Sequence, residues 1–405
     1  MQDFKQKMRT LKKPAVFLAI FLCLILILSA FFVNMAKKHP EFVQSRNRPW
    51  LNIQNEKKNS IDVLVLGDSE SYTTFSPLEI WKQNGIASFV CGQTGQEVEE
   101  TYYMLRRALR TQEPKVVVFE TNSMFQPQNA AEGFSKTIAQ TVNYYFPVFL
   151  LHSMWQNWLM GPEKQQVYYK GFVVRDIVEP YDGGSYMEKT ERREYMSRAV
   201  RSYMDKMLAM CREKGISVIL YSAPSPNNYN YAKHNTLTDY AEQNGAEYLD
   251  FNLMTEELGI DWEKDSLDNG DHLNVLGAEK LSRYFGSYLE EHYDLEDHRK
   301  DPEYSSWNED VQKYQNAEKN AIRKIEVILE YLRKKKLKRR RAGFSETSPS
   351  LRQRSESVPR LRSHKEPWNT YSLRRVCRRH HAHKQTAGSL PGSWNRGLRR
   401  RYSRP

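Results

Sequence analysis

The sequence predicts a three-layer α/β/α domain with a mostly parallel sheet, preceded by one transmembrane helix and followed by a disordered basic tail. Three observations lead to this prediction. Residues 15–35 form an uncharged apolar run, short β-branched runs alternate with amphipathic stretches from residue 61 onward, and the composition changes abruptly after residue 332. Strands that alternate with helical stretches are typical of a parallel sheet covered by helices on both faces.

The apolar run at residues 15–35 has the length of a membrane-spanning helix. Its 21 residues carry no charge and extend over about 30 Å at about 1.5 Å per residue. A cleaved signal peptide would have a shorter apolar core and a clear small-residue cleavage site. Five Lys and Arg precede the run and four follow it closely, so we expect residues 1–14 in the cytoplasm and the body outside it. The chain is then a single-pass protein of the cell membrane, with a linker at residues 36–60.

Five strands and three helices are predicted within a domain at residues 61–295. The strands are expected at 61–66, 88–90, 115–120, 217–221 and 247–251, and the helices at 97–109, 192–214 and 274–290. The strand segments at 61–66, 115–120 and 217–221 are rich in β-branched residues, and the helical segments repeat apolar residues at intervals of three and four. Because ligand sites in mostly parallel sheets lie beyond the carboxyl ends of the strands, we expect the functional residues there.

A long insertion at residues 123–190 separates the third and fourth predicted strands. A segment of this length without strand character is more often functional than accidental. We interpret it as a cap over the site that can stack on sugar rings, although a hydrophobic cluster that only packs is as good an interpretation of most of its aromatic residues. These residues are Tyr144, Tyr145, Phe146, Trp155, Trp158, Tyr168, Tyr169 and Phe172.

A serine and a histidine stand where chemistry is expected. The first strand ends in Gly67-Asp68-Ser69, which places Ser69 at the carboxyl edge of the sheet. A serine hydroxyl is a poor nucleophile unless a base within hydrogen-bond reach accepts its proton. His272, directly before the last helix of the domain, is the predicted base, because Asp268 and Asp271 are close enough in sequence to orient its ring.

The order of these residues resembles the SGNH/GDSL hydrolase superfamily. Gly67-Asp68-Ser69 resembles the block that carries the nucleophile, Gly92 the second block, Asn122 the third and His272 the last. The resemblance covers more than half of the chain and implies a flavodoxin-like fold of the SGNH hydrolase type. It also implies catalysis by Ser69 and His272, with an oxyanion hole formed by the backbone N–H groups of Ser69 and Gly92 and the side-chain amide of Asn122.

One position departs from the pattern of the superfamily. The usual aspartate three residues before the histidine is Asn269 here, and acids stand at Asp268 and Asp271 instead. We rank Asp271 slightly above Asp268 as the third member of the triad. A dyad of Ser69 and His272, with neither acid engaged, is the remaining alternative.

The anchor and the catalytic pattern together indicate a function at the cell envelope. Single-span exported members of the superfamily act in alginate O-acetylation and teichoic-acid D-alanylation, and this chain resembles them in architecture. The resemblance implies a serine esterase or O-acyltransferase that forms an acyl-Ser69 intermediate and acts on a cell-envelope polysaccharide or teichoic-acid-like polymer at the membrane. A membrane acyltransferase is an expected source of the acyl donor. The alternative is a non-catalytic SGNH-fold protein that binds or scaffolds envelope carbohydrate.

Charge is distributed very unevenly along the chain. Residues 333–405 hold 23 Lys and Arg against 3 Asp and Glu and so carry +20, and since the whole chain carries +12, the first 332 residues carry −8. We expect a C-terminal helical extension at residues 296–332 and a disordered basic tail at residues 333–405, which has too few apolar residues to form a core. Nucleic acid is not an expected partner, because only the tail is basic. Its composition equally fits translation of a shifted reading frame, and we assign it no function.

Metal and cofactor sites are not predicted. The four cysteines, Cys23, Cys91, Cys211 and Cys377, are far apart in sequence, and no CxxC pair, phosphate-binding glycine loop or dinucleotide fingerprint occurs. A disulfide between Cys91 and Cys211 is conceivable outside the cytoplasm, but buried free thiols are the preferred interpretation. The predicted chemistry therefore needs no metal and no cofactor.

Overall fold

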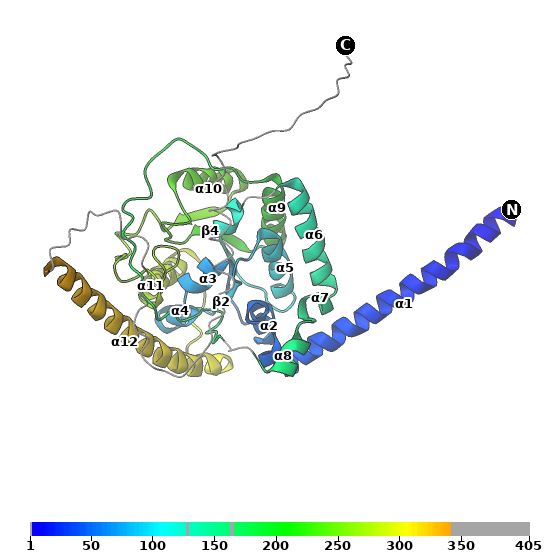
Figure 1. Cartoon of the computed structure of the whole chain (residues 1–405), viewed down its shortest axis with the longest axis horizontal. Helices are drawn as coiled ribbons and strands as arrows, with labels where there is room; N and C mark the ends of the chain where they lie inside the picture. The colour runs from blue at the N-terminus through cyan, green and yellow to red at the C-terminus, as the bar shows by residue number, and fades with distance from the viewer. Residues whose placement is uncertain (1, 127–128, 163–165, 342–405) are drawn as a thin grey trace, which may run out of the picture. The chain divides into compact units, whose positions relative to one another are not determined.

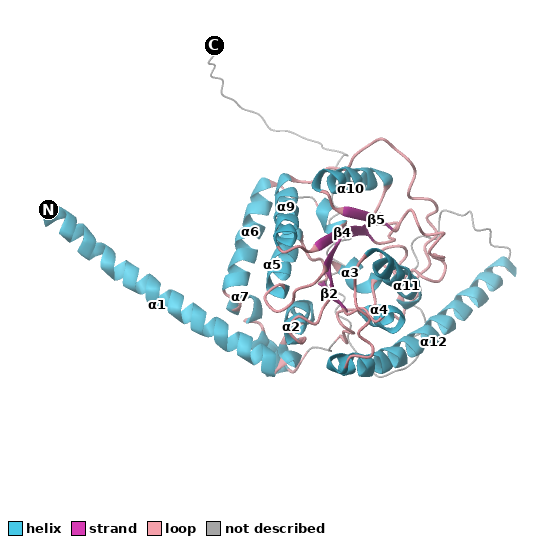
Figure 2. Cartoon of the chain, turned by 180° about the vertical axis from the view of Figure 1, so that it is seen from behind, coloured by secondary structure: helices cyan, strands magenta, loops and turns pink. Residues whose placement is uncertain are grey.

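The computed structural model describes residues 2–126, 129–162 and 166–341. Its central element is a parallel sheet in the order β2-β1-β3-β4-β5, which is the flavodoxin-like order and confirms the predicted fold class (Figures 1 and 2). The strands are β1 (Val63–Gly67), β2 (Ser88–Gly92), β3 (Val116–Glu120), β4 (Ser217–Ser222) and β5 (Glu247–Asp250).

Helices precede, cover and follow the sheet. The α-helices are α1 (Gln2–Lys38), α2 (Arg48–Asn55), α3 (Ser69–Thr74), α4 (Pro77–Asn84), α5 (Val98–Ala108), α6 (Ala130–Tyr145), α7 (Val148–Leu151), α8 (Met154–Met160), α9 (Arg198–Glu213), α10 (Tyr231–Asn244), α11 (Val275–His292) and α12 (Ser305–Arg341). Short 3₁₀ turns are η1 (Pro40–Phe42), η2 (Ser45–Asn47), η3 (Asn122–Phe125) and η4 (Pro302–Tyr304).

Two apolar clusters bury the two faces of the sheet. Successive strand residues point to opposite faces, so one strand contributes to both clusters. On β1, Leu64 and Leu66 belong to the cluster that includes residues of α2, α5, α9 and α10. Val63 and Val65 belong to the other cluster, with residues of α3, α4 and α11. The loops that carry the predicted site follow the carboxyl ends of these strands, at one edge of the sheet.

Two predicted helices have different bounds in the structure. The helix expected at 192–214 begins only at Arg198, because Ser197 caps it by accepting a hydrogen bond from the backbone N–H of Val200 at 3.2 Å. The helix expected to end at residue 332 continues to Arg341 as α12. The predicted disorder is therefore wrong for residues 333–341, since lysine and arginine are good helix formers and Lys334 pairs with Glu330 one turn earlier. Residues 342–405, the rest of the predicted tail, lie outside the described residues.

The insertion does not form one cap over the site. α6 packs on α5, α7 packs on α1, and α8 packs on η1, so the part that contains Trp155 and Trp158 lies against the anchor side of the domain. The second part, from Gln166 onward, passes the loop that precedes α11, where Glu179 N donates to Ser266 O at 3.2 Å. This second part borders the loop that carries His272. The helix that holds Trp155 and Trp158 packs on η1 instead, so the expectation that these two rings cap the site is wrong.

The N-terminal helix has the length and composition predicted for a membrane span, and Cys91 and Cys211 are the buried free thiols expected from the sequence. Residues 12–38 of α1 are long and apolar enough to cross a membrane, by length and composition, and nearly all of this stretch is exposed. Cys91 and Cys211 are buried free thiols, and Cys23 is free and exposed on α1. Cys377 lies outside the described residues.

Candidate active site

Ser69 is the first residue of α3 and follows β1 directly. Asp68 separates the strand from the helix and caps it, with its Oδ1 accepting a hydrogen bond from the backbone N–H of Glu70 at 3.0 Å. The preceding Gly67 has no room for a side chain, because a Cβ there would collide with the Cβ of Glu120 on β3. β1 and β3 therefore approach each other closely at this point, and Ser69 begins α3 at the carboxyl edge of the sheet.

His272 meets Ser69 across 203 residues of sequence. Its Nε2 lies 2.8 Å from Ser69 Oγ, and its Nδ1 lies 2.8 Å from Asp268 Oδ2. The imidazole ring is mostly buried, with 15% of the side chain exposed. Asp268 also accepts a hydrogen bond from the backbone N–H of His272 at 2.7 Å through its other oxygen. Hydroxyl, imidazole and carboxylate therefore form one hydrogen-bonded chain, the arrangement in which a histidine can accept a serine proton.

The acid that orients His272 is Asp268 and not Asp271, which the sequence analysis ranked first. Asp271 Oδ2 is 3.6 Å from Nδ1, beyond hydrogen-bond distance. The loop reaches this geometry through two residues in the left-handed region, Asn269 with φ of 58° and Gly270 with φ of 87°. This tight turn folds Asp268 back onto the ring. In the superfamily the acid usually stands three residues before the histidine. The turn explains how Asp268, four residues before His272, contacts the ring in its place.

The two other predicted site residues, Gly92 and Asn122, lie beside the nucleophile loop. A Cβ at Gly92 would collide with Ser71 Oγ, so the end of β2 approaches α3 as only glycine allows. The side-chain amide of Asn122 donates to Asp68 Oδ2 at 3.1 Å. Both residues therefore neighbour Ser69, and their role in an oxyanion hole stays a prediction.

A network of buried acids behind the nucleophile was not foreseen from the sequence. Glu70 is fully buried, and its Oε1 accepts from the side-chain amide of Asn228, which also donates to Asp271 Oδ1, both at 2.6 Å. Glu70 Oε2 has no hydrogen-bond partner. The sequence signal was a second acid beside the nucleophile, since Asp68 precedes Ser69 and Glu70 follows it.

A second buried acid, Glu120, adjoins this network. It ends β3, its two oxygens accept the backbone N–H of Asn122 at 2.9 Å, and it also accepts a short hydrogen bond from Tyr229. Burial, followed by the charges of Asp68 and Glu70, raises the pKa of Glu120 well above its usual value. Burial likewise raises the pKa of Asp68. These carboxyl groups thus tend to hold protons next to the site.

The acids around His272 change its proton affinity. Burial by itself lowers the pKa of His272, but the charges of Glu70, Asp268 and Asp271 outweigh it and raise the pKa to about 10. Burial raises the pKa of Glu70 to about 8. Since a negative Glu70 favours the imidazolium and an imidazolium favours the ionised Glu70, the two groups titrate together. A general base must be neutral, so this coupling sets the pH at which His272 works.

Replacing Glu70 with glutamine is expected to move the rising limb of the pH profile for ester hydrolysis to lower pH. In the native chain, kcat/KM should increase from neutral pH towards pH 10 as His272 loses its proton. Without the Glu70 charge the imidazolium is less stable, so the pKa of His272 falls. The neutral base then forms at a pH about one to three units lower than in the native chain. Stopped-flow or plate assays with a soluble chromogenic ester across pH 5–10 measure this shift.

The control for this experiment is Glu79→Gln. Glu79 on α4 is a buried acid that pairs with Arg283 on α11, and it is not part of the network around His272. Its profile should follow that of the native chain. Superimposable profiles for Glu70→Gln and the native chain would contradict the coupling.

Within the described residues, three potential metal ligands gather at this site. Glu70, Asp271 and His272 each have a ligand atom within 4.8 Å of the others. Both ring nitrogens of His272 already have partners, Ser69 and Asp268, which leaves the ring no free nitrogen for a metal. We therefore describe this group as part of the proton-sharing network.

Comparisons with known proteins give only distant likenesses to solved structures. No protein-family profile matches the chain, and no curated protein matches it. A GDSL-like lipase from Bacteroides thetaiotaomicron VPI-5482 has 11% identity and a TM-score of 0.33, over 61% of this chain and 99% of the lipase. A lipase/acylhydrolase from Enterococcus faecalis has 12% identity and a TM-score of 0.34, over 58% of this chain and 99% of that protein. Both are lipolytic hydrolases. At such low identity and TM-score these likenesses carry no inference about chemistry, which rests on the contacts of Ser69, His272 and Asp268.

Proposed function

We propose that the chain is a membrane-anchored, extracytoplasmic serine esterase or O-acyltransferase that acts on acyl groups of a cell-envelope polysaccharide or teichoic-acid-like polymer. The observation that carries the proposal is the hydrogen-bonded chain from Ser69 Oγ through His272 to Asp268. Three side chains from two distant loops converge in the geometry that nucleophilic ester chemistry requires. The long apolar helix α1 supports the location at the membrane.

The proposed reaction proceeds in two steps through Ser69. His272 Nε2 accepts the proton from Ser69 Oγ while Oγ bonds to the carbonyl carbon of the acyl ester. The bond from that carbon to the alcohol oxygen then breaks, and the leaving alcohol takes the proton from His272. In the second step, water or a polymer hydroxyl gives its proton to His272 and bonds to the acyl carbon of acyl-Ser69. The bond from that carbon to Ser69 Oγ then breaks, and His272 returns the proton to Oγ, which restores the serine hydroxyl and the neutral base. Asp268 keeps the ring oriented and stabilises its positive charge in both steps.

Backbone and side-chain donors near Ser69 support the proposal for an oxyanion hole. As the carbonyl carbon becomes tetrahedral, its oxygen gains negative charge, and the loss of one donor to such an oxygen typically costs about 3 kcal/mol. Gly92 and Asn122 neighbour the nucleophile loop and are the candidates in addition to the N–H group of Ser69.

The test of the proposed function is capture of the acyl intermediate. The full-length chain in lipid nanodiscs is incubated with O-acetylated polysaccharide or D-alanylated teichoic acid, quenched in acid and digested for mass spectrometry. The peptide that contains Ser69 should gain the mass of one acyl group, and the Ser69→Ala chain should gain none. Addition of unacylated polymer then separates transfer, which labels the polymer, from hydrolysis, which releases free acid.

The opposite result favours a carbohydrate-binding protein without catalysis. In that case the polymer binds equally to the native chain and to a chain with Ser69→Ala and His272→Ala, and no acyl group appears on any peptide. Such a result would overturn the proposed function.

A further inference from the structure

An uncharged segment of the insertion exposes an unusual amount of apolar surface. Residues 137–162 contain no Asp, Glu, Lys or Arg over 26 positions, in a chain in which 27% of residues are charged. Large apolar side chains on this segment are exposed instead of buried, at 47% to 80% of their area. They are Phe149, Trp155, Trp158, Leu159 and Met160, together with Tyr145 at the end of α6.

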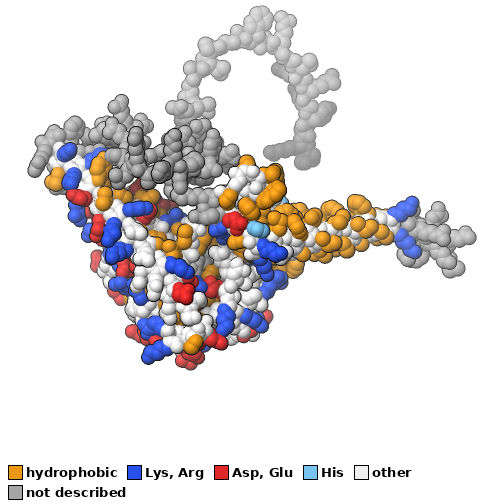
Figure 3. Space-filling view, turned by 90° about the horizontal axis from the view of Figure 1, so that it is seen from below, with side chains coloured by type: hydrophobic (Ala, Val, Ile, Leu, Met, Phe, Trp, Pro, Cys, Tyr) orange, Lys and Arg blue, Asp and Glu red, His pale blue; other side chains and the backbone are white. Residues whose placement is uncertain are grey.

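The same segment is fastened to the end of α1 and to the linker that follows it. α7 packs on α1, and the backbone N–H of Val148 donates to Ser29 Oγ at 3.4 Å. The side chain of Asn157 on α8 donates to Phe42 O at 2.9 Å. Ser29 and Ala36 are accordingly buried, whereas most of α1 before them is exposed. Figure 3 shows the apolar surface of α1 continuing onto the body at the base of the helix.

The position of these contacts along α1 gives their depth in a membrane. Lys37 and Lys38 end the apolar run, and Ser29 lies eight residues before Lys37, which is about 12 Å along a helix. Half of the hydrocarbon core of a bilayer is about 15 Å thick. If α1 spans the bilayer with Lys37 and Lys38 at the headgroups, the α7 end that contacts Ser29 lies below the headgroup level.

We propose that α7 and α8 form an interfacial element that inserts into the outer leaflet of the bilayer beside α1. This inference rests on the proposed membrane anchor and extends it from one attachment to two. A lipid surface is the occupant that fits, because the exposed face is continuous with the spanning helix and carries no charge. Its two tryptophans have the amphipathic rings that gather at membrane interfaces, and partial insertion of short apolar helices is a known mode of membrane attachment.

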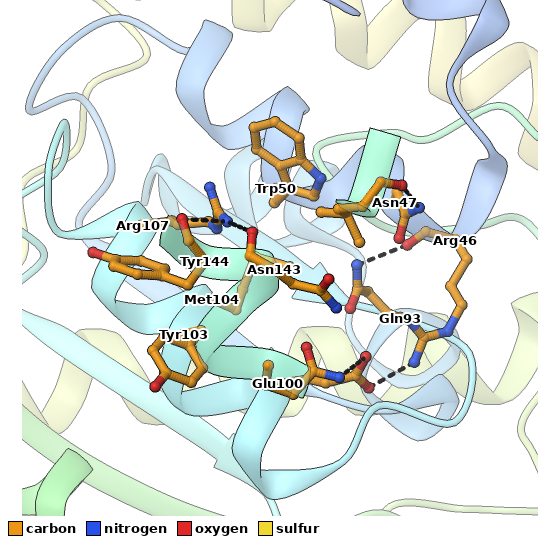
Figure 4. Close-up of a pocket in the computed structure, with 12 residues that line it drawn as sticks. Arg46, Asn47, Trp50, Gln93, Glu100, Tyr103, Met104, Arg107, Asn143 and Tyr144 are labelled. Carbon is orange, nitrogen blue, oxygen red and sulfur yellow. Dashed lines mark hydrogen bonds and ion pairs between the residues drawn. The ribbon is translucent and has the colours of Figure 1, made fainter. Parts of the chain in front are cut away.

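A second attachment would fix how the active site faces the membrane. The linker residue Arg46 pairs with Glu100 at 2.6 Å, and its carbonyl accepts from Gln93 at 2.8 Å (Figure 4). Its side chain also donates to Thr94 O at 3.1 Å. Gln93 and Thr94 directly follow Gly92 at the carboxyl end of β2. The linker that joins the anchor thus touches the edge of the sheet that holds Ser69. With α7 and α8 in the leaflet, this edge is held near the membrane surface, where a membrane-attached acyl ester is presented.

Tryptophan quenching in brominated lipid tests this inference. The full-length chain is placed in vesicles of phosphatidylcholine with acyl chains brominated near the headgroups, and α1 contributes no signal because residues 2–38 contain no tryptophan. We expect quenching in the native chain and loss of most of it in a chain with Trp155→Phe and Trp158→Phe. The matched control, Trp262→Phe, removes a ring that packs with Tyr181 and Tyr186 and should leave the quenching unchanged.

Alkaline carbonate extraction of the same vesicles shows whether a negative result refutes only the interfacial element or also the membrane anchor. If the chain resists extraction but removal of Trp155 and Trp158 leaves the quenching unchanged, the interfacial element is refuted while the anchor stands. If carbonate releases the native chain, the anchor and the interfacial element fail together. Resistance to extraction combined with quenching that depends on these two tryptophans supports the inference.

Discussion

Replacement of Ser69 by alanine is expected to lower kcat for hydrolysis of a chromogenic acetyl ester by about 10⁴- to 10⁶-fold. Ser69 Oγ is the hydroxyl that His272 Nε2 contacts, at 2.8 Å, and the alanine leaves no atom that can form the acyl intermediate. The loss should fall on kcat with little change in KM, because Ser69 contributes to the transition state far more than to binding of the ester. Initial rates of the purified full-length chain in nanodiscs measure it.

Ser71→Ala provides the matched control for this result. Ser71 lies on the same short helix, but its hydroxyl donates to the backbone oxygen of Asp68 at 2.7 Å and does not contact His272. Its activity should remain within an order of magnitude of the native value. Equal turnover by the Ser69→Ala chain and the native chain would remove the catalytic role of Ser69, provided that both have the same circular dichroism spectrum.

Replacement of Asp268 by asparagine is expected to lower kcat by about 10⁴-fold, which is typical for loss of a triad acid. Asp268 accepts from His272 through both of its oxygens, one from the ring and one from the backbone. An asparagine keeps the size of the side chain but stabilises the imidazolium poorly and favours the wrong tautomer of the ring. Single-turnover rates with the chromogenic ester separate this loss from any change in product release.

Asp271→Asn is the comparison that decides between the two acids. Its carboxylate is 3.6 Å from His272 Nδ1 and 42% exposed, and a partly exposed charge pair of this kind contributes about 1 kcal/mol or less. The expected loss in kcat is therefore less than about tenfold. A larger loss for Asp271→Asn than for Asp268→Asn would mean that the loop rearranges when substrate binds and that Asp271 becomes the partner of the ring.

Much of the fold could be predicted from local patterns in the sequence. The buried strands β1 and β3 are short, valine-rich apolar runs, and α11 repeats apolar residues with helical spacing, so each element has a local signal. The short helices α3, α7 and α8 have four to seven residues and lack such a signal. Their formation depends on packing that only the folded chain provides.

Some residues of the candidate site could be predicted from the sequence and others could not. Ser69 and His272 could be identified because each stands at a recognisable boundary, one after a strand and one before a helix. The triad acid could not, because Asp268 and Asp271 are equally close to His272 in sequence. Their difference arises from the left-handed turn at Asn269 and Gly270. The role of Glu70 was not predicted either, because its effect on the pKa of His272 depends on burial. The identity of a single residue does not show whether it is buried.

Local patterns in the sequence were enough to predict an apolar N-terminal helix, a parallel sheet, and a serine and a histidine at the ends of its elements, because these properties depend on residues close together in the chain. Three features could be seen only in the folded chain: which acid contacts the histidine, the burial of Glu70 beside the site, and the packing of α7 on α1. These features depend on distances between residues far apart in sequence and on exclusion of water, and both exist only after the chain has folded.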